Sequence, residues 1–162
     1  AVDANVGKLA RLLRILGFDA SYQRAWDDAA LVLEAAAQGR IVVTKDRRLL
    51  KRTLVTHGYL VREEDPGQQL RNLLRFYDLG PPFRPFSRCV HCNEPLRPVA
   101  KEAVLPRLEP LTKRYFHEFH ICPACERVYW KGSHHERLRH DLGTLLGMDA
   151  ALDTELNQTP ER

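Results

Sequence analysis

The sequence CVHC at residues 89–92, matched by CPAC at residues 122–125, decides how the second half of the chain folds. In each stretch a tight turn can aim two thiolates at one point, and two such turns complete a tetrahedral site of four sulfurs. The pattern therefore predicts one structural zinc ion held by Cys89, Cys92, Cys122 and Cys125. Four thiolates leave no open position for water, so we expect this zinc to stabilise the fold and not to catalyse a reaction.

Residues before the first cysteine carry the patterns of a separate α/β domain. Leucines at 9, 12, 13 and 16 follow helical spacing, and the run IVVT at 41–44 is typical of a buried parallel strand. We expect strands at residues 1–3, 19–23, 41–44 and 59–61, and helices at residues 7–16, 28–38, 47–57 and 66–77. Strands that alternate with helices predict an α/β fold with a mainly parallel sheet.

Composition shifts along the chain divide it into four parts. We expect the α/β domain at residues 1–79, a stiff proline-rich linker at 80–86, and a zinc ribbon with a C-terminal helix at 87–148. Leucines at 138, 142 and 145 predict that helix. Residues 149–162 are acidic, and we expect a disordered tail there. The chain starts without Met and with what reads as the end of a strand, so we expect it to be a fragment of a longer protein.

Composition also narrows the class of protein. Apolar residues make up 44% of the chain, as in a folded soluble protein. No apolar run approaches the roughly 20 residues that cross a bilayer, and no signal peptide is visible. We therefore expect a cytoplasmic protein with no membrane partner. The net charge of +4 is compatible with a polyanion partner, and a solvated surface of mixed charge is the alternative.

Three aspartates stand where a parallel sheet could bring them to one edge. Asp3 ends the first strand, Asp46 follows the strand at 41–44, and Asp28 begins a helix. Functional groups gather at the carboxyl ends of parallel strands, so these carboxylates are candidates for one shared site. Clustered carboxylates repel one another, and a bound Mg²⁺ or Mn²⁺ ion removes that penalty. A helix-capping role is the alternative for Asp28 and for Asp46.

A divalent ion at such a site can activate water and stabilise the oxygens of a phosphodiester during hydrolysis. Basic side chains flank the predicted site and would hold phosphates: Lys8, Arg11, Arg14, Lys45, Arg47 and Arg48. On the ribbon, Trp130, Lys131 and His134 combine aromatic and basic character and could bind single-stranded RNA. The alternative places Trp130 in the ribbon core and His134 at the start of the C-terminal helix.

Several of these stretches resemble one family. VDAN at 2–5 and GKLARLLRILGFD at 7–19, DDAAL at 27–31, VTKDRRL at 43–49, both C-x-x-C pairs and VYWKGSH at 128–134 are similar to the Mut-seven C-terminal RNase family. That family joins a PIN-like nuclease domain to a zinc ribbon. The resemblance implies a three-layer PIN-like fold and metal-dependent RNA cleavage, with Asp3, Asp28 and Asp46 as the Mg²⁺ or Mn²⁺ ligands. Common PIN nucleases also carry a glutamate on an intervening helix, and no segment here matches it.

Three hypotheses follow. The leading one is a PIN-like endoribonuclease that hydrolyses RNA phosphodiesters. The second is a non-catalytic module that binds RNA, the ribosome or another RNA–protein partner on a decayed nuclease fold. The missing fourth acid and the weak basic excess motivate it. The third is a toxin-like or protein-interaction module that docks through the ribbon.

Overall fold

The computed structural model describes residues 1–147, so the predicted acidic tail at 149–162 lies outside the described residues. The first half contains α1 (Gly7–Ile15), α2 (Asp28–Ala37), β1 (Val42–Thr44), β2 (Gly58–Leu60) and α3 (Pro66–Phe76). The ribbon follows with β3 (Arg97–Val99), α4 (Lys101–Val104), α5 (Pro110–Tyr115), β4 (Phe119–Ile121) and β5 (Val128–Tyr129). The helix α6 (Ser133–Leu146) comes last, and short 3₁₀ turns lie at Ala4–Val6, Leu49–Lys51 and Leu105–Arg107.

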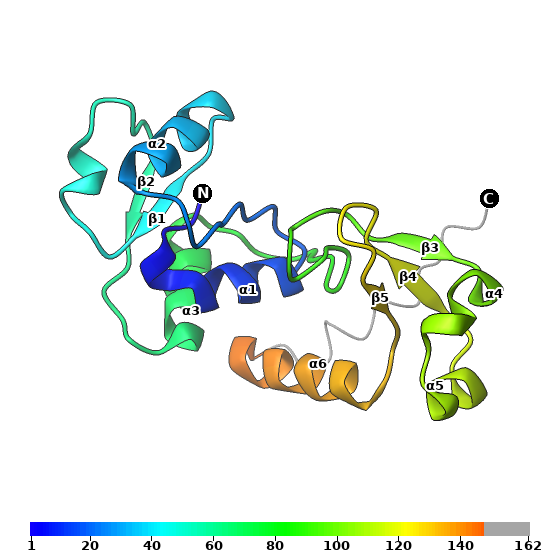
Figure 1. The fold of residues 1–162 in the computed structure, drawn as a ribbon. Coiled ribbons are helices and arrows are strands. Elements are labelled where there is room, and N and C mark those ends of the chain that lie inside the picture. Colours follow the sequence, from blue (N-terminus) through cyan, green and yellow to red (C-terminus); the bar gives the residue numbers. More distant parts are fainter. Residues whose placement is uncertain (148–162) are drawn as a thin grey trace.

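The first sheet is small and parallel. β1 pairs with β2 so that Val43 lies opposite Tyr59, and Val2 adds an isolated parallel bridge to Val43. Side chains of adjacent strand residues point to opposite faces. Val43 accordingly packs in one apolar cluster with α1 and α3, and Val42 packs in another with α2. Helices therefore cover both faces of the sheet (Figure 1).

Two of the predicted helices have clear local causes. In α1 the apolar stripe turns inward, and Leu9 and Leu13 are buried. α3 begins where the side chain of Asp65 accepts a hydrogen bond from the amide of Gln68 at 2.9 Å. Pro66 stands at the first position of that helix, where a missing N–H carries no penalty. Both helices form near the predicted residues, and α1 ends one residue early.

Two other predicted elements are wrong. Residues 19–23 form no strand, because their one backbone bond to the sheet is that from the amide of Val2 to the carbonyl of Ser21 at 2.9 Å. Residues 47–57 form no α-helix and contain only the 3₁₀ turn Leu49–Lys51. The β-branched residues Thr53, Val55 and Thr56 in this segment disfavour a helix.

The proline-rich segment 80–86 packs along the end of α1. Phe83 is buried, the amide of Arg84 donates to Leu16 at 3.2 Å, and the amide of Phe86 donates to Ile15 at 2.8 Å. Gly17 has a φ of +94°, and a Cβ there would collide with the carbonyl of Arg84. Segment 80–86 therefore lies against the end of α1, and its role as a linker stays a prediction.

The C-terminal helix α6 returns to the first half of the molecule (Figure 1). Leu142 is buried in the same cluster as α1 and α3, and Leu145 packs against Gly67. Arg71 Nη1 donates to the carbonyl of Leu145 at 2.9 Å. The predicted division into residues 1–79 and 87–148 stays a prediction, but α6 shares its core with the residues before the linker.

The ribbon is a second, antiparallel sheet in the order β3-β4-β5. Val104, Leu108 and Phe119 form its small core, and α4 and α5 fill the excursion between the cysteine pairs. The chain thus has a mixed α/β fold with separate parallel and antiparallel sheets. Across residues 1–147, no helix combines the length and the apolar character needed to cross a membrane.

Candidate functional site

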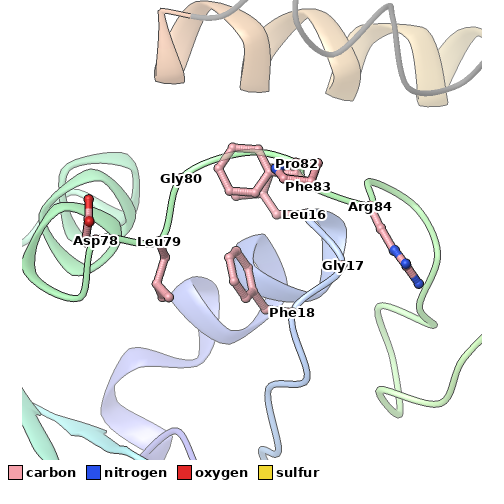
Figure 2. A pocket seen from close by; sticks show the side chains of 9 residues that line it. All are labelled: Leu16, Gly17, Phe18, Asp78, Leu79, Gly80, Pro82, Phe83 and Arg84. Carbon is pink, nitrogen blue, oxygen red and sulfur yellow. The ribbon is translucent and has the colours of Figure 1, made fainter.

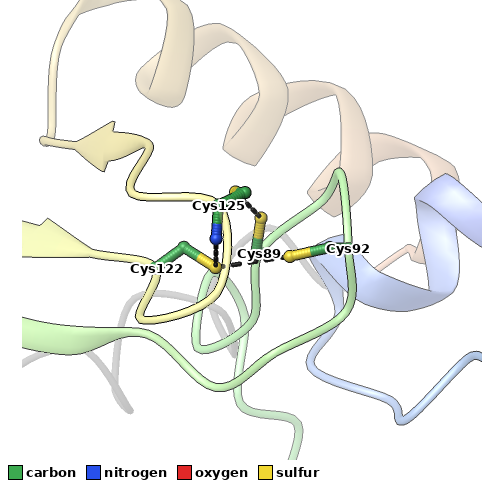
Figure 3. A group of neighbouring side chains, drawn as sticks. All are labelled: Cys89, Cys92, Cys122 and Cys125. Carbon is green, nitrogen blue, oxygen red and sulfur yellow. Dashed lines mark hydrogen bonds between the residues drawn. The ribbon is translucent and has the colours of Figure 1, made fainter.

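The four cysteines meet at one end of the antiparallel sheet, where the loop before β3 lies beside the loop between β4 and β5 (Figure 3). Their sulfur atoms all lie within 4.8 Å of one another, with 3.6 Å between Cys89 and Cys125 and 3.3 Å between Cys92 and Cys122. Zn–S bonds of about 2.3 Å in a tetrahedron place sulfurs roughly 3.8 Å apart. The cluster is close to that size, so the donor set fits a structural zinc ion.

The two turns that carry the cysteines share one backbone conformation. We name them the first knuckle (residues 88–94) and the second knuckle (residues 121–127). In each, the amide of the first cysteine donates to the carbonyl five residues later, at 2.8 Å from Cys89 and 3.0 Å from Cys122. In both knuckles, the amide four residues after the first cysteine donates to the carbonyl of that cysteine at 2.9 Å. Asn93 and Glu126 occupy this position with positive φ values of 73° and 57°.

Tyr129, at the end of β5, supports the cluster from the side. Its hydroxyl lies 3.0 Å from Sγ of Cys89 and can donate to a thiolate. Burial raises the pKa of the Cys89 thiol, but the bond from Tyr129 and two backbone donors outweigh burial and lower it to about 6. Burial, together with the same bond, raises the pKa of Tyr129. Tyr129 therefore favours the thiolate form that binds zinc.

Thr44 joins two of the three predicted acidic residues. It ends β1 and is fully buried, with 0% of its surface exposed. Its Oγ1 donates to Oδ2 of Asp3 at 2.6 Å and accepts from the amide of Asp46 at 2.9 Å. The amide of Asp3 donates to the carbonyl of Val43 at 2.9 Å. Asp3 and Asp46 thus share one edge of the parallel sheet.

Asn5 and Lys45 add further polar contacts to the same end of the parallel sheet. Nδ2 of Asn5 donates to the same Oδ2 of Asp3 at 2.6 Å, and its Oδ1 accepts from the amide of Lys45 at 3.3 Å. Nζ of Lys45 lies 2.7 Å from a carboxylate oxygen of Glu64, which follows β2. We call Asp3, Asn5, Thr44 and Asp46 the acidic edge.

Capping of α2 and metal binding are the two roles considered for the acidic residues at its start, and the cap is Asp27, not Asp28. Oδ1 of Asp27 accepts from the amide of Ala30 at 2.8 Å, so Asp27 caps the helix. Oδ2 of Asp28 lies 3.3 Å from Nη2 of Arg52, and both side chains are about half exposed. Asp46 also has a local role, because its Oδ1 accepts from the amide of Arg48 at 2.7 Å.

The three aspartates do not form a closed set of ligands. Within residues 1–147, the four cysteines are the one group of three or more His, Cys, Asp or Glu side chains close enough to share an ion. Thr44 connects Asp3 to Asp46, whereas Asp28 projects from the start of α2 and is paired with Arg52. A shared Mg²⁺ or Mn²⁺ centre therefore stays a prediction.

The predicted RNA-binding residues differ in how exposed their side chains are. Exposed side chains in this set are Lys8, Arg11, Arg47, Arg48, Lys131 and His134, and Lys45 is half-buried. Trp130 is 37% exposed and stands against Phe119, with 6.3 Å between ring centroids, so it belongs partly to the ribbon core.

Arg14 corrects the prediction for its own position. It is only 3% exposed, so its side chain is not available to a phosphate. Its guanidinium instead donates to backbone carbonyls, among them that of Ala20 at 2.8 Å and that of His91 at 2.8 Å. Arg14 was predicted to lie beside the site and hold phosphate, because the sequence does not reveal that the first knuckle covers this end of α1.

Sequence reasoning missed Asn5, Thr44 and Tyr129. Asn5 and Thr44 lie within the stretches VDAN and VTKD that carry the family resemblance, so their proximity to Asp3 and Asp46 was an available signal. Tyr129 follows the last cysteine by only four residues, but nothing in that spacing indicates that its hydroxyl turns back to Cys89.

The structure also contains a pocket of about 330 Å³ (Figure 2). The end of α1 and residues 78–84 form it, with Leu16, Phe18 and Phe83 among the residues that line it. None of the predicted site residues lines this cavity.

Comparison with known families identifies the family of the chain. The family model described as the Mut7-C RNAse domain matches residues 1–142, which covers both the acidic edge and the zinc-ligand cluster. No curated protein and no solved structure matches the chain significantly. On the match to residues 1–142, the chain belongs to the Mut7-C RNase family.

Proposed function

We propose that the protein is a metal-dependent ribonuclease with a PIN-like domain, and that the acidic edge together with Asp28 forms its active site. The observation that carries the proposal is the contact of Thr44 with both Asp3 and Asp46. A fully buried threonine that orders two acidic residues at the end of a parallel strand is suited to a site where ligands need fixed positions. Membership in an RNase family supports the same chemistry.

Each residue has a distinct task in this proposal. Asn5 and Thr44 both donate to Oδ2 of Asp3, and within the described chain no donor approaches its Oδ1, which stays available to a ligand. Asp46 would supply the second carboxylate. Asp28 would join by exchanging its contact with Arg52, an exposed ion pair of a kind worth only about 0–1 kcal/mol. When bound, Mg²⁺ or Mn²⁺ would supply an activated water and offset charge on the phosphate.

RNA is the substrate that the surrounding surface would accept. Lys8, Arg11, Arg47 and Arg48 are exposed and would bind the phosphate backbone. Trp130, Lys131 and His134 would make further contacts on the ribbon. The zinc ion would have a structural task only, because its four ligands leave no site for water.

The test is cleavage of a panel of single-stranded and structured RNAs by the purified chain with Mn²⁺. We expect Asp46→Asn and Asp28→Asn to abolish cleavage, because asparagine keeps the shape but loses the charge. Asp27→Asn is the matched control, since asparagine caps a helix as well as aspartate does. If the wild type shows no cleavage that Asp46→Asn abolishes, the proposal is wrong. RNA binding that survives in Asp3→Asn and Asp46→Asn would then favour the non-catalytic binding module.

A further inference from the structure

Arg14 connects the end of α1 to the first knuckle. Its Nη1 donates to the carbonyls of Val90 at 3.3 Å and His91 at 2.8 Å, the two residues between the first pair of cysteines. Its Nε donates to Ala20 at 2.8 Å and its Nη2 to Tyr22 at 3.3 Å. One buried guanidinium thus joins residues 20–22 to a turn whose shape zinc would fix.

Asn93 makes a second connection from the same knuckle. Its Oδ1 accepts from the amide of Ala20 at 3.0 Å, and its Nδ2 donates to Oδ1 of Asp19 at 2.6 Å. Asn93 has a φ of 73° and donates its own amide to the carbonyl of Cys89, so the knuckle determines its position. The equivalent residue of the second knuckle, Glu126, makes no such contact: its carbonyl faces Arg107 within the ribbon.

Residues 19–22, which receive these contacts, are in turn hydrogen-bonded to the chain next to the acidic edge. The carbonyl of Ser21 accepts from the amide of Val2 at 2.9 Å. Val2 precedes Asp3, whose amide donates to the carbonyl of Val43. Hydrogen bonds from the first knuckle therefore reach Ala20, and a further hydrogen bond from the next residue, Ser21, reaches Val2 beside Asp3.

We propose that Arg14 and Asn93 are positioning residues through which the zinc-bound first knuckle holds residues 19–22, and thereby Asp3, in place. The inference rests on the proposed function only in naming Asp3 as a metal ligand. Without zinc, four thiols would no longer draw the knuckle together, and the acceptors of Arg14 would lose their fixed positions. Zinc would thus affect the acidic edge without taking part in its chemistry.

Amide hydrogen exchange of the full chain, followed residue by residue with NMR, tests this. Asn93→Gly removes the side chain and tolerates the positive φ. We expect it to retain one zinc per chain and to speed exchange at Val2 and Asp3 about tenfold, with no change at Val61, whose amide donates to Thr44. Glu126→Gly is the matched control at the equivalent position and should leave Val2 and Asp3 unchanged. Arg14→Lys keeps the charge but lacks the fork of donors, and should speed the same two amides.

The outcomes separate this inference from the proposed function. Wild-type exchange at Val2 and Asp3 in Asn93→Gly would overturn it, and so would equal acceleration in Glu126→Gly. Mn²⁺ binding, measured by electron paramagnetic resonance, should weaken in Asn93→Gly and not in Glu126→Gly. If the wild type binds no Mn²⁺ at all, the proposed function fails, while the exchange result still decides the connection.

Discussion

The cysteine cluster and the acidic edge differ in how complete they are without a metal ion. The four sulfurs already stand within 4.8 Å of one another and are close to the size of a zinc site. The acidic edge joins only Asp3 and Asp46 closely, and Asp28 faces Arg52. Thiolates on two tight turns are brought together by local backbone geometry, whereas carboxylates from distant segments depend on the whole sheet and repel one another when their charges are not offset.

Residue spacing therefore predicts a metal site only where that spacing itself sets the geometry of the ligands. Each knuckle places its cysteines by hydrogen bonds inside seven residues. The acidic edge needs the bridge from Val2 to Val43, the end of β1 and the buried hydroxyl of Thr44. Four substitutions test this difference between the two sites.

The largest effect should come from Cys122→Ser. Removing one thiolate opens the site, and structural zinc binding is worth on the order of 10 kcal/mol in small zinc domains. We expect loss of the bound zinc, measured by metal analysis, and loss of the antiparallel sheet, measured by circular dichroism. His91→Ala should retain zinc, since His91 is not a member of the cluster. A zinc-loaded Cys122→Ser protein would contradict the four-sulfur assignment.

Asp3→Asn should have the next largest effect, and on activity only. We expect cleavage of RNA to fall at least about a hundredfold, because the metal ion loses a charged ligand whose field is worth several kcal/mol. The melting temperature should change by no more than about 3 °C, since asparagine keeps the shape of the side chain. Asp65→Asn, at the cap of α3, serves as the control. Full activity in Asp3→Asn would remove Asp3 from the site.

Thr44→Val tests whether the acidic edge is ordered from within. Valine has the shape of threonine but leaves the amide of Asp46 unpaired and takes one donor from Asp3. We expect a loss of about 1–3 kcal/mol in the free energy of unfolding, measured with urea, and weaker Mn²⁺ binding. Thr56→Val, at an exposed position, should change stability by less than about 0.5 kcal/mol. An unchanged Thr44→Val protein would show that the hydroxyl does not order the carboxylates.

Tyr129→Phe should have the smallest effect. It removes the hydroxyl next to Cys89 and leaves the ring in place. We expect zinc affinity, measured by competition with a chelator, to fall about tenfold, the lower end for a group that supports a metal ligand. Tyr115→Phe is the control, because Tyr115 is 61% exposed. Equal zinc affinity in the two variants would show that the cysteines alone determine binding.

Much of the fold could be predicted from periodicity and caps. The leucine stripe of α1, the cap at Asp65 and the run that forms β1 all act locally. Residues 47–57 and 19–23 were predicted wrongly because tertiary contacts and β-branched side chains outweigh a weak local pattern. The site could be predicted less well from the sequence. The burial of Arg14, for example, depends on the first knuckle, which lies more than 70 residues away in the sequence.

The packing of α6 has a consequence for how the chain folds as it is synthesised. Leu142 completes an apolar cluster whose other members include residues of α1 and α3. When residues 1–86 have left the ribosome, that face has no cover, and the ribbon must be made before α6 can reach it. Apolar surface that waits for a later segment is prone to aggregation. We therefore expect a nascent chain that stops before α6 to need a chaperone, because the apolar cluster of α1 and α3 stays partly uncovered until α6 has been made.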